Sequence, residues 1–131
     1  MKKEYRFKYG GALVGGAEVK AITRIVKNNW WPWGKEGELF EKEAAKFLGV
    51  KYAIGANSGS SACLLALSAL ELEKGSEVII PATTFPTVFN AILQCGLTPV
   101  VVDSKIGTYN LDPNELRAAI SDKTKAIICV H

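Results

Sequence analysis

The stretch Ala53-Ile-Gly-Ala-Asn-Ser-Gly-Ser-Ser-Ala-Cys-Leu-Leu-Ala-Leu67 governs how the rest of the chain is interpreted. Its first residues predict a short apolar strand, Asn57–Gly59 predicts a tight turn, and an apolar helix is expected from Ser60. Glycine at a bend lets a ligand approach the backbone closely, and the first amides of a helix lack intrahelical partners. Together these features predict a cradle for a phosphorylated ligand, with serine hydroxyls as additional donors.

The same turn also has a purely structural interpretation. Ser58 or Ser60 can cap the helix with no ligand present, because a serine oxygen accepts a hydrogen bond from an unpaired amide. The turn lacks the Gly-Lys-Ser/Thr of a P-loop and the later glycines of the dinucleotide-binding motif. The local sequence therefore leaves phosphate binding and simple capping open.

Beyond this stretch, short apolar runs alternate with helical patterns. Strands are expected near 52–56, 76–80, 98–102 and 125–130, and helices near 60–71, 86–95 and 112–121. Alternating strands and helices predict an α/β fold with a mostly parallel sheet. The runs at 78–80, 100–102 and 127–128 suit strands covered on both faces, and the helix near 60–71 is apolar nearly all round, so we expect it to be buried.

Loops that follow parallel strands meet at the carboxyl edge of the sheet, where ligands bind in such folds. Three segments are expected at that edge: the turn Asn57–Ser61, the loop Pro81–Thr87 and the loop Asp103–Tyr109. Their convergence favours the phosphate interpretation over capping alone. Asp112-Pro113 is a typical N-cap followed by proline at the first helical position.

Residues 1–51 differ in character from the rest. An amphipathic helix containing Val19 and Ile22 is expected before Asn28-Asn29, and a second helix should end at Gly49. Between them, Trp30-Trp31-Pro32-Trp33-Gly34 predicts an irregular loop. We therefore expect a helical segment with a Trp-rich loop over 1–51 and part of an α/β domain over 52–131.

The amino-acid composition is that of an ordinary globular protein and does not favour nucleic acid or a membrane as a partner. The 131 residues are 48% hydrophobic and 22% charged with a net charge of +3, and basic residues are scattered, so nucleic-acid binding is not favoured. No apolar run is long enough for a membrane span, and no signal peptide is recognisable, so we expect a cytoplasmic protein. Cys63, Cys95 and Cys129 fit no metal or redox spacing and are expected to be core thiols.

A series of ordered motifs carries a family resemblance. They are Trp30…Gly34…Phe40-Glu41, Phe47-Leu48-Gly49-Val50, Asn57-Ser-Gly-Ser-Ser-Ala62, Gly75-Ser-Glu-Val-Ile-Ile-Pro-Ala-Thr-Thr-Phe85, Gly96-Leu-Thr-Pro-Val-Val-Val-Asp103, Tyr109-Asn-Leu-Asp112 and Lys123-Thr-Lys-Ala-Ile127. The series resembles the front part of the DegT/StrS-type enzymes that act on nucleotide-linked keto-sugars, and it covers nearly the whole chain. The resemblance implies the aspartate-aminotransferase fold: a three-layer, mostly parallel sheet forming the front of the large domain of a fold-type I enzyme that uses pyridoxal 5'-phosphate.

The resemblance also implies roles for particular residues. Gly59, Ser60 and Ser61 would hold the cofactor phosphate, chiefly through backbone amides, and Phe85 would stack on the cofactor ring. The alternative for Phe85 is core packing beside a helix start. The segment Asn29–Gly34 matches the family's loop near the sugar nucleotide, which makes Trp30, Trp31, Trp33 and Gly34 substrate-binding candidates. Three tryptophans beside a proline also suit a hydrophobic plug or a dimer contact.

The implied reaction moves an amino group from a donor, expected to be glutamate, to a nucleotide-linked keto-sugar in amino-sugar biosynthesis, in a homodimer. The Schiff-base lysine of the family and the aspartate that pairs with the pyridine nitrogen lie beyond the position of His131. We therefore expect an N-terminal piece with no catalytic residue of its own, no metal site and no activity alone. The chain also ends on a strand that should lie inside a sheet.

Two other interpretations of the chain stay open. The first is a 3-dehydratase of the same family, which carries histidine in place of the lysine; Cys63 departs from that subgroup, where asparagine is expected. The second is a non-catalytic remnant or phosphate-binding module.

Overall fold

The computed structural model describes residues 10–130. The chain divides into two compact units, Met1–Ile54 and Gly55–His131, and each is considered by itself. Within the described residues no helix is long and apolar enough to cross a membrane. His131, to which the sequence assigns no role, lies outside the described residues.

The first unit contains two helices, α1 (Gly16–Lys27) and α2 (Lys35–Leu48), joined by the Trp-rich loop. Gly49 ends α2 with a φ of 68°, a left-handed conformation that glycine adopts without strain, so the predicted helix stop is confirmed. Ala45 is the residue of α2 that is buried, and α1 buries none.

The second unit is built on a parallel sheet. Its elements in chain order are α3 (Gly59–Ala69), β1 (Glu77–Pro81), α4 (Pro86–Gln94), β2 (Thr98–Val102), α5 (Pro113–Ala119) and β3 (Thr124–Ile127). The strand order is β2-β1-β3, and both pairings are parallel, with Ile79 opposite Val100 on one side and Ile127 on the other. The predicted α/β class and parallel sheet are confirmed.

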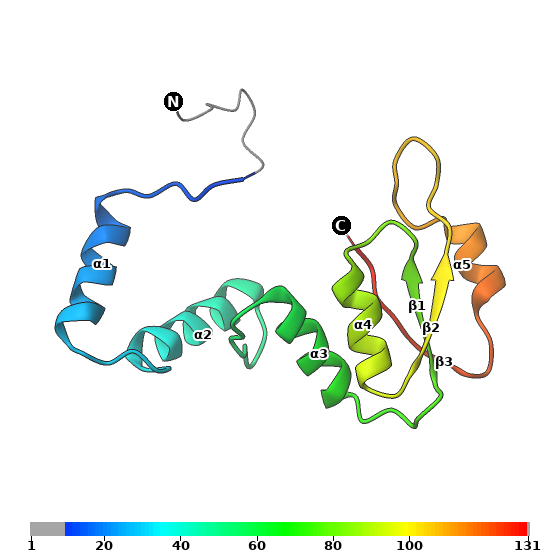
Figure 1. Cartoon of the computed structure of the whole chain (residues 1–131), viewed down its shortest axis with the longest axis horizontal. Coiled ribbons are helices and arrows are strands. Elements are labelled where there is room, and N and C mark those ends of the chain that lie inside the picture. The colour runs from blue at the N-terminus through cyan, green and yellow to red at the C-terminus, as the bar shows by residue number, and fades with distance from the viewer. Residues whose placement is uncertain (1–9, 131) are drawn as a thin grey trace, which may run out of the picture. The chain divides into compact units, whose positions relative to one another are not determined.

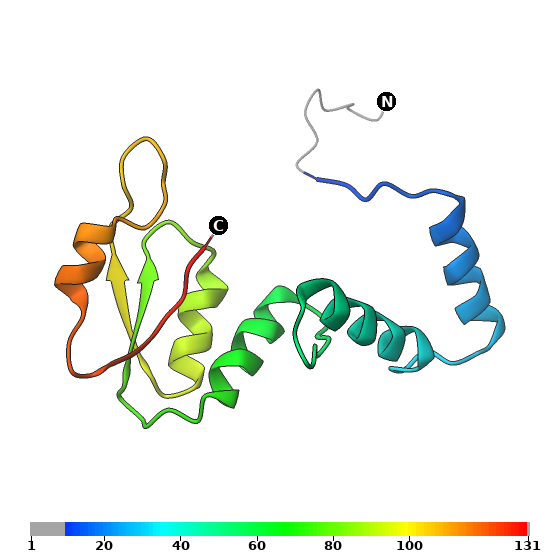
Figure 2. The ribbon, with the colours of Figure 1, turned by 180° about the vertical axis from the view of Figure 1, so that it is seen from behind.

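The helices lie in layers on both sides of this sheet. The connection from β1 to β2 runs through α4 in one direction, and the connection from β2 to β3 runs through α5 in the opposite direction. Because such crossovers are right-handed, reversing the direction places the two helices on opposite faces. Figures 1 and 2 show α4 on one side of the strands and α5 on the other.

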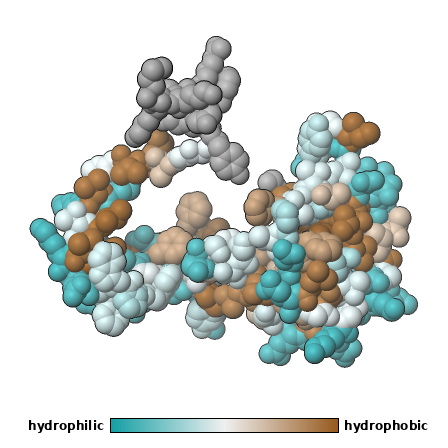
Figure 3. All heavy atoms as spheres, in the orientation of Figure 1, coloured by the Kyte–Doolittle hydropathy of each residue, from teal (hydrophilic) through white to brown (hydrophobic). Residues whose placement is uncertain are grey.

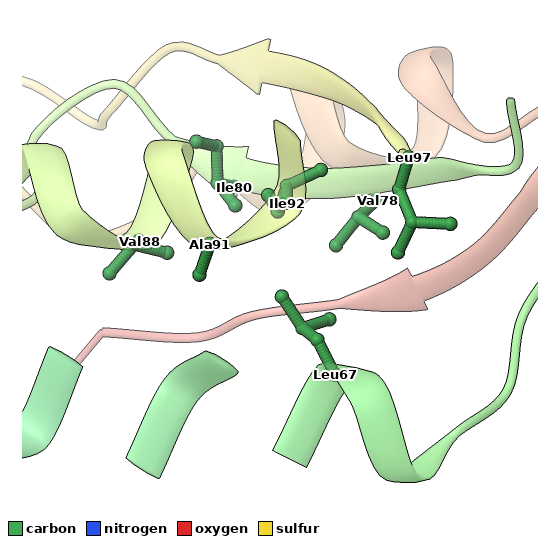
Figure 4. Packing of buried hydrophobic residues seen from close by; sticks show 7 residues of the cluster. All are labelled: Leu67, Val78, Ile80, Val88, Ala91, Ile92 and Leu97. Carbon is green, nitrogen blue, oxygen red and sulfur yellow. The ribbon is translucent and has the colours of Figure 1, made fainter. Parts of the chain in front are cut away.

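The core lies between β1 and the helices α3 and α4. Figure 4 shows the side chains that meet there: Leu67, Val78, Ile80, Val88, Ala91, Ile92 and Leu97. Ile79 is also fully buried but is not in this cluster. Since successive strand residues point to opposite faces, Ile79 packs on the side of α5.

Several expectations about the strands and their burial were wrong. Residues 52–56 form no strand: a strand needs a neighbour, and this segment pairs with none of β1, β2 and β3. The last strand ends at Ile127 rather than near 130. Only the central strand β1 is covered on both faces; the edge strands β2 and β3 are each partly exposed.

The helix α3 and one cysteine also differ from expectation. Leu67 is the buried residue of α3, because its main packing partner is α4 and its other faces meet solvent. Cys63 and Cys95 are half-buried beside the core, while Cys129 lies past the end of β3 and is exposed. All three thiols are free.

Candidate cofactor and substrate sites

The start of α3 is capped by Ser58. Its backbone is extended, and its Oγ accepts a hydrogen bond from the backbone amide of Ser61 at 3.1 Å. The Ser58 hydroxyl also lies 3.0 Å from the Ser61 hydroxyl and 3.4 Å from Asn57 Oδ1. The capping interpretation is therefore correct for Ser58, and the amide of Ser61 already has a partner.

The amides of Gly59 and Ser60 differ from that of Ser61. Within the described residues neither has a hydrogen-bond acceptor, as expected for the first turn of a helix. A Cβ built on Gly59 would meet no atom within 4 Å, and Gly59 does not adopt a positive φ. The fold itself therefore does not require glycine here, and the space beside these two amides is open.

The segment between β1 and α4 carries Phe85. Pro81 is fully buried and Pro86 is the first residue of α4, so prolines hold both ends of this segment. Phe85 is the N-cap residue of α4 and its side chain is 70% exposed, so within this structure it does not anchor the core. The starts of α3 and α4 both lie toward the end of the unit where the strands finish (Figures 1 and 2).

Two buried hydroxyls were missed by the sequence analysis. Thr84 Oγ1 and Ser104 Oγ are buried and have no hydrogen-bond partner within the described residues. Both follow the carboxyl end of a strand, β1 and β2 respectively. Unpaired buried hydroxyls are uncommon, and their position is where ligands bind in parallel sheets. A hydroxyl residue within three positions of the end of an apolar strand was the sequence signal for them.

The third loop, which follows β2, is held by its own backbone. Ser104 pairs with Leu111 in an antiparallel bridge, and the Lys105 amide donates to the Asn110 carbonyl at 2.8 Å. Asp112 then caps α5 by accepting from the Asn114 amide at 2.8 Å, which confirms the predicted cap. Asp103, at the start of this loop, is exposed.

In the first unit, the Trp-rich loop forms a hollow of about 840 Å³, within the range of small-molecule sites. Its lining includes Arg24, Asn28, Trp30, Trp31, Trp33 and Lys35. We refer to this feature as the Trp hollow. The sequence-predicted substrate residues Trp30, Trp31, Trp33 and Gly34 all line it, so the structure brings these four together.

Two of the tryptophans are fixed against the start of α2. Trp30 Nε1 donates to the Trp33 carbonyl at 3.3 Å, and a Cβ on Gly34 would lie 2.7 Å from Trp30 Cδ1. A Cβ on Gly37 would lie 2.5 Å from the Trp33 ring, so a side chain at either glycine would displace an indole. Trp31 has no such contact and is 69% exposed.

Arg24 and Glu36 both line the Trp hollow and pair with each other. Arg24 Nε and Nη2 both donate to the same carboxylate oxygen, Glu36 Oε1, at 3.1 Å and 2.5 Å. The pair joins α1 to α2 across 12 positions. Sequence reasoning missed it because the two residues belong to different helices and share no local pattern.

Comparison with known proteins assigns the family. Residues 13–131 match the DegT/DnrJ/EryC1/StrS aminotransferase family. The chain belongs to this family. A spore coat polysaccharide biosynthesis protein of Bacillus subtilis is 38% identical over 130 residues, which are 99% of this chain and 33% of that protein. A dTDP-3-amino-3,6-dideoxy-alpha-D-galactopyranose transaminase of Aneurinibacillus thermoaerophilus is 38% identical over 112 residues, 86% of this chain and 31% of that protein.

A solved structure agrees with this family assignment. The crystal structure of GDP-4-keto-6-deoxymannose-3-dehydratase with a trapped PLP-glutamate geminal diamine matches with a TM-score of 0.89 and 34% identity, covering 95% of this chain and 34% of that chain. The chain thus spans about a third of the length of these relatives. The family contains both aminotransferases and 3-dehydratases, and the chain matches the front portion of each.

Proposed function

We propose that this chain is the front third of an enzyme that uses pyridoxal 5'-phosphate to transfer an amino group to a nucleotide-linked keto-sugar. The observation that carries this proposal is the open helix start at Gly59, in a family in which a solved member holds a PLP-glutamate adduct. The relative that is a transaminase of a dTDP-linked amino sugar supports the substrate class.

The described residues fit the phosphate of the cofactor. Gly59 and Ser60 offer two unpaired amides, and the partial positive charge at the start of α3 adds to them. Ser61 contributes its hydroxyl rather than its amide, since Ser58 already accepts from that amide. The exposed ring of Phe85 offers a flat apolar face for stacking. Bound pyridoxal phosphate would supply the electron sink that amino-group transfer needs.

The Trp hollow would receive the nucleotide-linked sugar. Trp31 offers an exposed indole face, while Trp30 and Trp33 are held in place against Gly34 and Gly37. Flat aromatic faces suit sugar and base rings. In this proposal residues 1–51 contribute substrate contacts and residues 52–131 form part of the cofactor-binding domain.

The rest of the full-length protein would supply the catalytic groups. The chain offers no lysine in the family's cofactor-binding motif, so we propose that it does not transaminate by itself. The parent protein would be a cytoplasmic homodimer that takes its amino group from glutamate, the amino acid present in the solved relative.

The second candidate is a 3-dehydratase, favoured by the match to the GDP-4-keto-6-deoxymannose-3-dehydratase. A non-catalytic remnant or phosphate-binding module is the third. Sequencing the native gene past the codon for His131 separates them: a lysine at the cofactor position supports the aminotransferase and a histidine supports the dehydratase. A stop codon there supports the remnant.

The decisive experiment uses the full-length protein. It is incubated with pyridoxal phosphate, glutamate and a GDP- or dTDP-linked 4-keto-6-deoxy sugar, and the products are analysed by mass spectrometry. An amino sugar, which gains nitrogen, is the expected product. A sugar that has lost an oxygen without gaining nitrogen would replace the aminotransferase by the dehydratase. If neither product forms although both ligands bind, the proposed activity is wrong.

A further inference from the structure

The Trp hollow has a charged side that the substrate assignment does not use. Arg24 and Lys35 bring two cations to its lining and Glu36 and Glu38 bring two carboxylates, of which Glu36 pairs with Arg24. None of these four residues was singled out from the sequence. A nucleoside diphosphate carries an aromatic base and two anionic phosphate groups, so a hollow that joins indole faces to cations matches both of its parts.

The ion pair between Arg24 and Glu36 is weak enough for Arg24 to leave Glu36 for a diphosphate. Its side chains are 55% and 42% exposed, and pairs this exposed contribute little to stability because water screens both charges. Arg24 also directs two of its N–H groups at a single carboxylate oxygen. A diphosphate presents several oxygens to a guanidinium, which allows parallel hydrogen bonds that Glu36 Oε1 alone does not give.

Trp31 is the tryptophan that best suits stacking with the base of the nucleotide. It lines the same hollow as Arg24 and is 69% exposed, against 60% for Trp30 and 53% for Trp33, whose rings lie against Gly34 and Gly37. A base stacked on Trp31 would gain stacking energy without displacing any contact that holds α2 in place. Base-to-indole stacking also tolerates different bases, because every base offers a π-face.

We infer that Arg24 is the diphosphate-binding residue of the Trp hollow, that Lys35 assists it, and that Glu36 holds Arg24 in place until a nucleotide displaces it. Glu36 therefore competes with the ligand for Arg24 and weakens nucleotide binding. This inference rests on the proposed function, since it concerns the nucleotide part of the proposed substrate.

Tryptophan fluorescence of the 131-residue chain tests the inference directly. All three tryptophans of the chain line the hollow, so their quenching reports only this site. Excitation at the red edge of indole absorption avoids the nucleotide. GDP and dTDP are the ligands, and guanosine and inorganic pyrophosphate are the two halves of the probe. We expect both nucleotides to bind, and each half alone to bind at least about tenfold more weakly.

The variants distinguish two roles of Glu36. If Glu36 competes with the nucleotide for Arg24, Glu36→Gln strengthens GDP binding; if the ion pair only holds the helices together, Glu36→Gln weakens it. Arg24→Gln should raise the Kd for GDP about tenfold or more, because it removes the charge and the fork of donors. Glu36→Gln should lower the Kd a few-fold, since Arg24 is released. Lys27→Gln is the matched control: it removes the same charge from α1 but does not line the hollow, and it should change the Kd less than about twofold.

Several results would overturn the inference. If Arg24→Gln and Glu36→Gln weaken GDP binding equally, the pair is only a structural link between α1 and α2. If Arg24→Gln unfolds the helices, as judged by circular dichroism, Arg24→Lys and Glu36→Gln still decide, and equal Kd values in these two and wild type would reject it. If wild type binds GDP but no variant differs, the inference fails while the substrate assignment stands. If wild type binds no nucleotide, the role of Arg24 and the assignment of the Trp hollow to the substrate both fail. Cofactor binding at Gly59 is a separate claim, which titration with pyridoxal phosphate tests.

Discussion

Gly59 is a glycine at a position where the fold itself does not require one. It is the first residue of α3, has a backbone conformation open to any residue and faces empty space. A helix prefers alanine to glycine, so the fold alone gives no reason for glycine at this position. Close approach of a phosphate to the backbone would give one.

We therefore predict that Gly59→Ala weakens binding of pyridoxal phosphate about tenfold or more, because a Cβ would stand where the phosphate approaches; charge-assisted hydrogen bonds contribute about 1.5–3 kcal/mol. Stability to urea should be unchanged or slightly higher. The measurement is titration of the chain with cofactor, followed by absorbance. Gly16→Ala is the control, since Gly16 is the first residue of α1 and equally open. Equal affinities of the two variants would count against the cradle.

Glu18 gives a pH-dependent prediction at the same scale. Hydrogen bonds from its own amide and from the Gly15 amide, the latter at 2.7 Å, lower the pKa of this exposed carboxyl below its ordinary 4.5. A lowered folded-state pKa means that the stabilisation of the start of α1 is present above the ordinary pKa and is lost as the pH falls through the folded value. Amide chemical shifts of Gly15 followed by NMR from about pH 6 to about pH 3 should show this step.

The control for this titration is Glu18→Gln, which keeps an oxygen acceptor but cannot ionise. The pH step at Gly15 should vanish in this variant. A midpoint at or above 4.5 in the wild-type chain would contradict the capping interaction.

At the scale of elements, α3 packs on the core with only one of its faces. Leu67 is 5% exposed and points into the core in Figure 4, whereas Leu65, two positions earlier, is 45% exposed. Side chains two apart on a helix point in different directions, so the apolar sequence of α3 serves the core at only part of its surface. The exposed remainder faces no element within the unit that buries it.

We predict that Leu67→Ala lowers the free energy of unfolding by about 2–5 kcal/mol, because it leaves a cavity between α3, α4 and β1. Leu65→Ala is the matched control and should cost about 1 kcal/mol or less. Urea unfolding followed by circular dichroism measures both. Equal losses would mean that α3 packs on a different face from the one described.

At the scale of the whole molecule, the second unit leaves much apolar surface uncovered. Figure 3 shows apolar side chains over a broad area of the visible face. Leu65, Phe89 and Leu93, on α3 and α4, and Leu70, which follows α3, are among the exposed large side chains. Exposed apolar patches of this kind mark surfaces that other parts of a protein cover, and the chain spans about a third of the length of its relatives.

We therefore predict that the folded chain binds the dye ANS, and that Leu65→Gln combined with Leu93→Gln lowers the dye signal by about half without shifting the unfolding midpoint. The control pair is Leu13→Gln with Ile106→Gln, which are more exposed and belong to neither α3 nor α4. An absent dye signal, or the same decrease in both pairs, would show that the surface on α3 and α4 is not a continuous apolar patch.

Local signals in the sequence determined most of the elements that form, where several of them begin and end, and to which family the chain belongs. Ser58 caps α3, Asp112 caps α5 and Gly49 ends α2, because capping and left-handed turns depend on a few adjacent residues. Only the tertiary structure decided which apolar residues are buried and which side chains meet. The strand expected at 52–56 does not form, most of α3 is exposed, and Arg24 meets Glu36. The physical reason is that burial and pairing depend on which elements come together, and a local pattern cannot specify a distant partner.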